Sequence, residues 1–199
     1  MLVSKRIEKK IKELPKGSLI FISDFTEEYG YEVTRKVLQR LHTRKEIIRI
    51  LRGIYYQPKE SELLGTLYPG ISQIAEAIAK RDRARIIPTG SYALNMLGLS
   101  TQIPMNVVYL TDGSARKIEL GKQKITFKKT SPKNLAVTHR LSNLIIQAFR
   151  ALGEKNVTSE IEAKIKEVID RSGETEIIKR EIINAPVWIQ KIVLRIIKN

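Results

Sequence analysis

The fold of this chain is decided by residues 24–56, which read DFTEEYGYEVTRKVLQRLHTRKEIIRILRGIYY. Asp24 with Glu27 predicts the start of a short helix, and Gly30 predicts its end. In the next segment apolar residues recur at helical spacing while arginine, glutamine and threonine occupy the other side, so a second helix is expected. Two β-rich runs flank Gly53 and predict a hairpin.

The segment before this stretch adds a helix and a strand. Ile7 and Ile11 lie at helical spacing within residues 3–13, and Leu19–Ile22 is long enough for one buried strand. The order helix, strand, helix, turn, helix and hairpin predicts a winged helix-turn-helix domain over residues 1–58.

The second helix and the hairpin carry side chains that suit DNA. Arginine donates a fork of hydrogen bonds to guanine, glutamine pairs with adenine, and the remaining cations reach phosphates. The expected DNA-binding residues are Thr34, Arg35, Lys36, Gln39, Arg40, Thr43, Arg44, Arg49 and Arg52. The alternative is that this basic face is only solvated, as charged helix faces commonly are.

The charge of the chain favours a polyanionic partner. The 36 Lys and Arg residues exceed the 21 Asp and Glu residues, and the net charge is +15. Residues 1–60 carry +6 and residues 80–140 carry +9. Such a field attracts nucleic acid, but by itself it does not distinguish DNA from RNA or anionic lipid.

Several site classes are not expected from the composition. Cysteine is absent and the two histidines, His42 and His139, are far apart in the sequence, so neither a metal site nor a cofactor is predicted. The amino terminus lacks the continuous apolar core of a signal peptide, and no stretch approaches the roughly 20 apolar residues of a membrane span. A cytoplasmic protein without a membrane partner is the expectation.

A second domain is predicted over residues 66–199, after a polar connector at residues 59–66. Short apolar runs alternate with helical patterns up to about residue 152, and two further helical patterns begin near Ser159 and Pro186. The expected class of the whole chain is therefore α+β, with the winged helix followed by a mixed α/β domain and a helical tail. The apolar stripe after Pro186 is interpreted as core rather than as a partner-binding face.

A row of lysines marks a candidate second basic surface. In the strand predicted at residues 122–129, alternate side chains share one face, and these are Lys122, Lys124, Thr126 and Lys128. The expected surface consists of Arg81, Arg83, Arg85, Arg116, Lys117, Lys122, Lys124 and Lys128. A nucleic-acid contact and a solubilised edge strand are equal alternatives for the lysine row.

Two motifs resemble those of the AbiEi family of antitoxins. They are Leu51-Arg52-Gly53-Ile54-Tyr55-Tyr56 and, further on, Thr89-Gly90-Ser91-Tyr92-Ala93-Leu94-Asn95-Met96-Leu97-Gly98-Leu99-Ser100. The likeness covers roughly residues 1–155. It implies a transcriptional regulator that represses its own abortive-infection operon through a winged helix bound to inverted repeats. It further implies a second domain that counters a nucleotidyltransferase toxin without forming a stable complex.

Catalysis is not expected. Gly90-Ser91 is similar to the phosphate-binding turn of nucleotidyltransferases, but the next acidic residue is Asp112 and no paired carboxylates follow to hold metal ions. Serine hydrolase signatures and glycine-rich phosphate loops are also missing from the sequence. The alternative to a DNA-binding regulator is a basic RNA- or ribosome-associated protein, which the larger charge block at residues 80–140 would suit.

Overall fold

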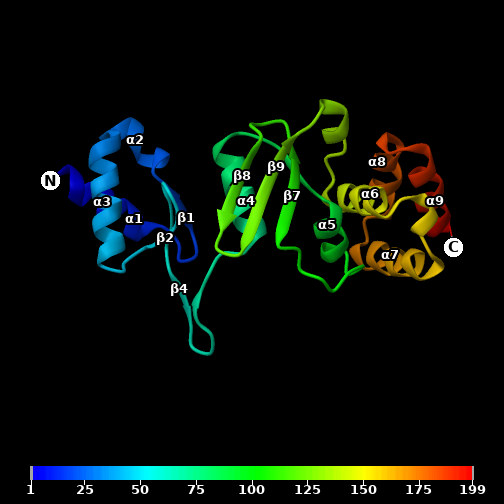
Figure 1. The fold of residues 1–199 in the computed structure, drawn as a ribbon, viewed down its shortest axis with the longest axis horizontal. Helices are drawn as coiled ribbons and strands as arrows, with labels where there is room; N and C mark the ends of the chain where they lie inside the picture. Colours follow the sequence, from blue (N-terminus) through cyan, green and yellow to red (C-terminus); the bar gives the residue numbers. More distant parts are fainter. Residues whose placement is uncertain (1, 199) are drawn as a thin grey trace. The chain divides into compact units, whose positions relative to one another are not determined.

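The computed structural model describes residues 2–198 and has a mixed α+β fold (Figure 1). The chain divides into an amino-terminal unit that ends at Ala77 and a carboxyl-terminal unit that begins at Ile78. The division falls inside helix α4 (Ile71–Arg81). Among residues 2–198, no helix is both long enough and apolar enough to cross a bilayer.

The amino-terminal unit contains three helices and a small antiparallel sheet, together with the hairpin described below. Its elements are α1 (Val3–Glu13), β1 (Leu19–Phe21), α2 (Ser23–Tyr29), α3 (Tyr31–Thr43), β2 (Ile48–Leu51) and β3 (Ile54–Tyr56). The strand order is β1-β3-β2, so β3, the second strand of the hairpin, lies between β1 and β2. The helices, the strand and the hairpin predicted from the sequence are therefore present.

Apolar side chains from α1 and α3 form the core of this unit. Ile7 and Ile11 of α1 pack with Leu38 and Leu41 of α3, and all four are at most 1% exposed. The predicted capping role of Asp24 is wrong, because α2 begins one residue earlier. The Asp24 carboxylate instead accepts a hydrogen bond of 2.9 Å from the backbone N–H of Phe21.

The polar connector predicted at residues 59–66 is in fact a β-hairpin, called the arm below. It consists of β4 (Lys59–Ser61), β5 (Gly65–Leu67) and the loop that joins them. The Tyr56 hydroxyl donates a 2.6 Å hydrogen bond to the carbonyl of Leu67 and fixes the base of the arm. Figure 1 shows the arm standing clear of the β1-β3-β2 sheet.

The carboxyl-terminal unit is built on a four-stranded mixed sheet. Its strands are β6 (Ile86–Thr89), β7 (Asn106–Thr111), β8 (Arg116–Leu120) and β9 (Gln123–Lys129), in the order β6-β7-β9-β8. Strand β9 pairs with β7 in parallel and with β8 antiparallel, so it lies inside the sheet. The edge-strand interpretation of the lysine row is therefore wrong.

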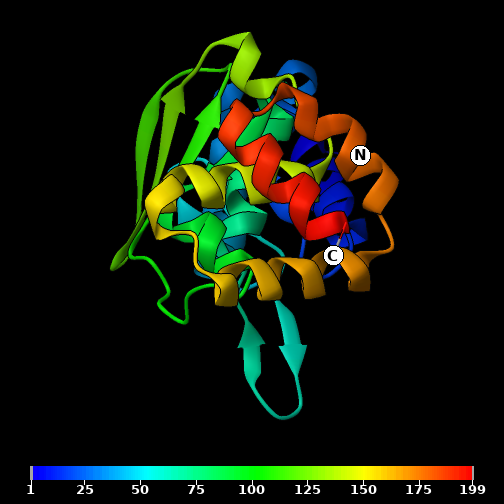
Figure 2. The ribbon, with the colours of Figure 1, turned by 90° about the vertical axis from the view of Figure 1, so that its right-hand side faces the viewer.

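Helices complete this unit and share a core of their own. They are α5 (Gly90–Met96), α6 (Arg140–Leu152), α7 (Ser159–Ser172), α8 (Thr175–Glu181) and α9 (Val187–Lys198), with short 3-10 turns at Pro132–Leu135, Glu154–Asn156 and Ile182–Asn184. Buried side chains of α5 to α9 form one apolar cluster, in which Figure 2 shows α9 in red. Ile189, Ile192 and Val193 belong to it, which confirms the core interpretation of the last apolar stripe.

One helix of this unit starts later than predicted. Apolar residues recur at helical spacing from Leu135 to Leu152 and predict one helix over that range, but α6 begins at Arg140 and Leu135 lies in a 3-10 turn. His139 ends the intervening segment, because its Nδ1 accepts the backbone N–H of Ser142 at 3.4 Å and thereby caps the helix.

Candidate nucleic-acid interface

Helix α3 presents one apolar side to the core and leaves the opposite side open to solvent. Thr34, Val37, Leu38 and Leu41 are buried, at spacings of three and four residues. Lys36, Gln39, Arg40, Thr43 and Arg44 lie on the remaining surface and are exposed. The hydrophobic period of the helix therefore determines which polar side chains face solvent.

Thr34 is a correction to the predicted DNA-binding set. Its side chain is 0% exposed, and its hydroxyl donates a 2.8 Å hydrogen bond to the carbonyl of Gly30. Because 34 is one turn before Leu38 in the buried stripe, the residue is turned toward the protein interior. A contact from Thr34 to a bound ligand would require the helix to leave the core.

A groove of about 360 Å³ runs between α3 and the β2–β3 hairpin and is called the α3 groove below. Five of the predicted residues line it, and they are Arg35, Gln39, Thr43, Arg49 and Arg52. Arg35, Gln39 and Thr43 are each four residues apart, so the helix stacks them along one side. The structure thus brings these five predicted residues, three from the helix and two from the hairpin, to one surface.

Within the α3 groove, Arg35 is held by a neighbour on its own helix. Its Nη2 lies 2.9 Å from the Glu32 carboxylate, three residues earlier. The hydrogen bond from Arg35 lowers the pKa of Glu32 below its usual value, and the same contact raises the pKa of Arg35. Both side chains are well exposed, so this pair orients the guanidinium but adds little to stability.

The two arginines of the hairpin have no such partner. Among residues 2–198, no carboxylate forms an ion pair with Arg49 or Arg52. Arg49 lies opposite Tyr55 in the β2–β3 ladder, and Arg52 lies in the two-residue turn with Gly53. Gly53 has a φ of +76°, and a Cβ there would approach Ile22 Cγ2 at 3.2 Å, so the turn needs glycine.

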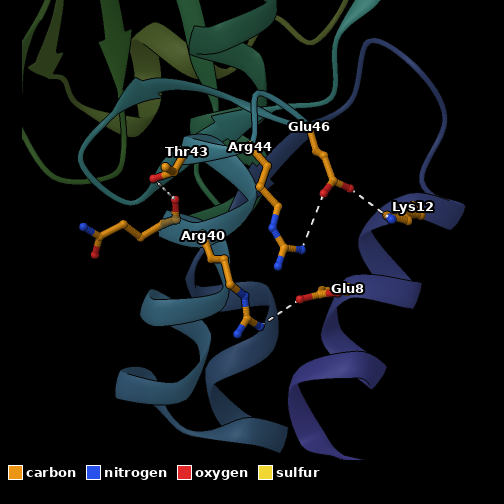
Figure 3. A network of polar contacts seen from close by, with 7 residues as sticks. Glu8, Lys12, Arg40, Thr43, Arg44 and Glu46 are labelled. Carbon is orange, nitrogen blue, oxygen red and sulfur yellow. Dashed lines mark hydrogen bonds and ion pairs between the residues drawn. The ribbon is translucent and has the colours of Figure 1, made fainter.

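The other side of α3 faces α1 through a network of ion pairs, shown in Figure 3. Arg40 donates a 2.8 Å hydrogen bond to Glu8, while Glu46 contacts Lys12 at 3.0 Å and Arg44 at 3.8 Å. Arg40 and Arg44 were predicted to contact DNA together with the groove residues. The structure places them on a separate flank, where carboxylates already offset part of their charge.

Three ring-bearing side chains of the α3 groove escaped the prediction from sequence. Tyr31 is 50% exposed at the start of α3, while His42 and Tyr55 form an edge-to-face ring pair 6.3 Å apart. The helical period contains a signal for His42, which is three residues after Gln39 and seven after Arg35. Tyr55 belongs to a strand, so only the pairing of the hairpin with α3 reveals it.

The predicted second basic surface is divided between the two faces of the β6–β9 sheet. In the register of β8 and β9, Lys117 lies opposite Thr126 and Arg116 lies opposite Phe127. Neighbouring residues of a strand point to opposite faces, so Arg116 and Lys117 do not share a surface. Lys117, Lys124 and Lys128 share the same face as Thr126, whereas Arg116 stacks over the Phe127 ring at 5.3 Å.

Two aspartates hold three of the predicted arginines. Asp82 pairs with Arg81 and with Arg116, and Asp112 accepts both the backbone N–H and the Nε of Arg85, at 2.7 and 2.8 Å. Burial raises the pKa of Asp82, but the hydrogen bonds from the two arginines outweigh it and the pKa is lowered. The hydrogen bonds from Arg85 lower the pKa of Asp112.

Within residues 2–198, the remaining cations of the second basic surface form no ion pair with Asp82 or Asp112. Lys124 lies 3.5 Å from Glu119 across the ladder, and Thr126 on the same face is buried and bonded to Asn106 at 2.8 Å. Lys122 lies in the turn before β9, and Arg83 follows the end of α4 with a φ of +52°. In the described part of the chain, no group of three or more His, Asp or Glu side chains could hold a metal ion.

Comparison with known proteins gives a family. No curated protein matches the chain. The solved structure of the RV2827C protein from Mycobacterium tuberculosis is similar to it over 98% of this chain and 75% of that chain, with 11% sequence identity and a TM-score of 0.47. Residues 6–177 match the family described as "Family of unknown function (DUF6088)". Because that match spans both units, the chain belongs to this family.

Proposed function

We propose that this protein is a DNA-binding regulator whose amino-terminal unit is a winged helix-turn-helix. In this proposal α3 enters the major groove and the β2–β3 hairpin is the wing. The observation that carries the proposal is the α3 groove, because Arg35, Gln39 and Thr43 from the helix lie there together with Arg49 and Arg52 from the hairpin. Gln39 and Arg35 would read base edges, and the hairpin arginines would contact phosphates.

The wider role follows from the resemblance to AbiEi antitoxins. The protein would bind inverted repeats in its own promoter, repress the operon, and counter a nucleotidyltransferase toxin through the carboxyl-terminal unit. Catalysis by this chain is not part of the proposal. The lysine face of the β6–β9 sheet would add phosphate contacts that do not depend on sequence.

The experiment is a footprint and a mobility-shift titration on the DNA upstream of the gene, with scrambled DNA as competitor. Arg35→Ala and Gln39→Ala should each weaken operator binding by about 1–3 kcal/mol and reduce the preference over scrambled DNA. Arg171→Ala is the matched control for Arg35→Ala, because Arg171 pairs with Glu167 on α7, outside the α3 groove. It removes the same charge and should leave the preference unchanged.

Two results would contradict the proposal. One is binding of equal strength to operator and scrambled DNA by the unsubstituted protein. The other is a preference for the operator that survives both α3 substitutions. Stronger competition by structured RNA than by operator DNA at equal salt would favour the RNA-associated alternative, which the +9 charge of residues 80–140 motivates.

A further inference from the structure

The tip of the arm exposes two large apolar side chains to solvent. Leu63 is 93% exposed and Leu64 is 77% exposed, and Glu62 beside them is also exposed. A two-stranded hairpin is only marginally stable alone in water, and both of its edges carry unpaired backbone groups. An arm of this kind gains order when its tip and edge are covered.

A second groove, called the arm-base groove, lies in the same unit at the base of the arm. Its volume is about 530 Å³, which is in the range of roughly 300–1,000 Å³ for pockets that enclose a whole small ligand. Ile11, Leu41 and Ile47 supply apolar side chains to its lining. Gln57 and Pro58 also line the groove. The remaining lining residues are charged, and they are Lys12, Lys16, Lys45, Glu46 and Glu60.

The lining of the arm-base groove contains a buried polar group that lacks a partner. Gln57 is 3% exposed, and within the described residues its Oε1 accepts no hydrogen bond. Buried amide oxygens are nearly always satisfied, and because this oxygen is closed to solvent, a donor in the groove reaches it only when the Gln57 side chain turns toward the groove. The unpaired backbone N–H groups of an arm are donors of this kind.

We propose that a second copy of this chain inserts its arm tip into the arm-base groove, and that the exchange is reciprocal. Leu63 and Leu64 of each copy enter the groove of the other and lose their own exposure to water, and Glu62 approaches Lys16 and Lys45, for which the described residues provide no ion pair. The two arms then lie antiparallel, with the tip of each beside the base of the other. Such an exchange is closed by a two-fold axis and leaves no free arm.

The arm is long enough for its tip to reach the second copy while the two amino-terminal units stay apart. From Pro58 to Leu63 five residues reach about 16 Å when extended. The inference deepens the proposed function, because reading an inverted repeat requires two copies of α3 related by a two-fold axis. An arm-mediated dimer would supply that pair before DNA is bound.

The first test measures the mass of the full-length protein by sedimentation in the absence of DNA. The unsubstituted chain should form a dimer at micromolar concentrations, and Leu63→Glu combined with Leu64→Glu should raise the dimer Kd by about 100-fold or more. Ile103→Glu is the control, since Ile103 is 72% exposed in the other unit. Circular dichroism should show all variants folded. A monomeric unsubstituted protein, or a double variant with unchanged Kd, would overturn the proposal.

The second test uses the absence of cysteine in the sequence. A tagged Leu63→Cys chain and an untagged Lys45→Cys chain are mixed and oxidised, so that only a contact between copies gives a mixed disulfide. We expect that product, and little from Leu63→Cys mixed with Lys36→Cys, because Lys36 does not line the arm-base groove. Equal yields from the two mixtures would exclude this docking site. Neither test contains DNA, so operator binding without arm exchange would leave the proposed function standing.

Discussion

Single side chains on α3 differ mainly in whether a carboxylate already holds them. Arg40 is bonded to Glu8 at 2.8 Å, whereas no carboxylate of the described residues pairs with Lys36 on the same exposed side. An exposed ion pair contributes at most about 1 kcal/mol, so a phosphate can compete for Arg40. If the proposed function holds, the Glu8 carboxylate should therefore limit how strongly this flank attracts DNA.

Replacing Glu8 tests that limit. Glu8→Gln frees Arg40, and we expect tighter binding to every DNA sequence and a slope of log K against log salt steeper by about 0.9. Glu13→Gln is the control, because it changes the net charge equally, while the ion pair of Glu13 within residues 2–198 is with Lys9, at 3.8 Å. The measurement is a DNA titration at several salt concentrations. Equal slopes for the two variants would show that Arg40 lies outside the interface.

At the scale of elements, the β2–β3 hairpin depends on its turn. Gly53→Ala forces a side chain into a φ of +76° and brings its Cβ to 3.2 Å from Ile22. We expect a loss of about 1–2 kcal/mol in the free energy of unfolding of the amino-terminal unit and weaker operator binding. Gly70→Ala is the control, because Gly70 has neither constraint. Urea unfolding followed by mobility shift distinguishes them, and equal destabilisation would contradict the role of the turn.

The sheet of the carboxyl-terminal unit should lose stability in acid. Asp82 and Asp112 have lowered pKa values in the folded protein because arginines hydrogen-bond them. A lowered folded pKa stabilises the protein above the unfolded value of about 3.9, and that contribution disappears as the pH falls through the folded pKa. We expect Asp82→Asn and Asp112→Asn to be less stable than the unsubstituted protein at pH 6, with the difference closing as the pH falls below the unfolded pKa of about 3.9 and through the folded pKa. Urea unfolding over this range provides the measurement, and a constant difference would refute the assignment.

Elements with a strong local pattern could be predicted from the sequence, and those set by distant partners could not. Ile7 and Ile11 were sufficient to place α1, because burial on a helix repeats with its turn. The arm was missed because Leu63 and Leu64 form an apolar pair without periodicity. Strand β9 lies inside its sheet because it pairs with β7, and β8 separates these two strands in the sequence. No local sequence pattern indicates such a pairing.

The candidate site was predicted in part for a similar reason. The residues of the α3 groove could be selected because charge and helical period agree over Arg35, Gln39 and Thr43. Thr34 was included wrongly, since a polar residue within a buried stripe is seen only when its hydroxyl is found bonded to Gly30. The predicted second basic surface also placed Arg116 and Lys117 together, although consecutive residues of a strand point to opposite faces of the sheet.

At the scale of the whole molecule, the two units have separate hydrophobic clusters, with Phe149 fully buried in one and Leu38 in the other. Each unit therefore has the apolar interior that an independent domain needs. The net charge of +15 acts on a polyanion through both units, since basic side chains are found in each. Sequence preference is expected from the α3 groove alone, and general affinity from both units.

Substitutions in the second unit test this division of roles. Lys128→Ala should weaken operator and scrambled DNA alike and flatten the salt slope by about 0.9. Lys124→Ala should have a smaller effect, because Glu119 lies 3.5 Å from its ammonium group. Lys166→Ala, in an ion pair of 3.4 Å with Asp170 on α7, is the control for lost charge. A loss confined to the operator would mean that this surface reads sequence.

The strand order β6-β7-β9-β8 also has a consequence for the order in which the strands are expected to pair during folding. Strands β8 and β9 are joined by two residues, Gly121 and Lys122, and Gly121 takes the φ of +60° that a tight hairpin turn requires. A hairpin of this kind closes in about 1–10 μs, long before a parallel pairing across an intervening strand can form. We therefore expect the β8–β9 hairpin to form before β9 pairs with β7.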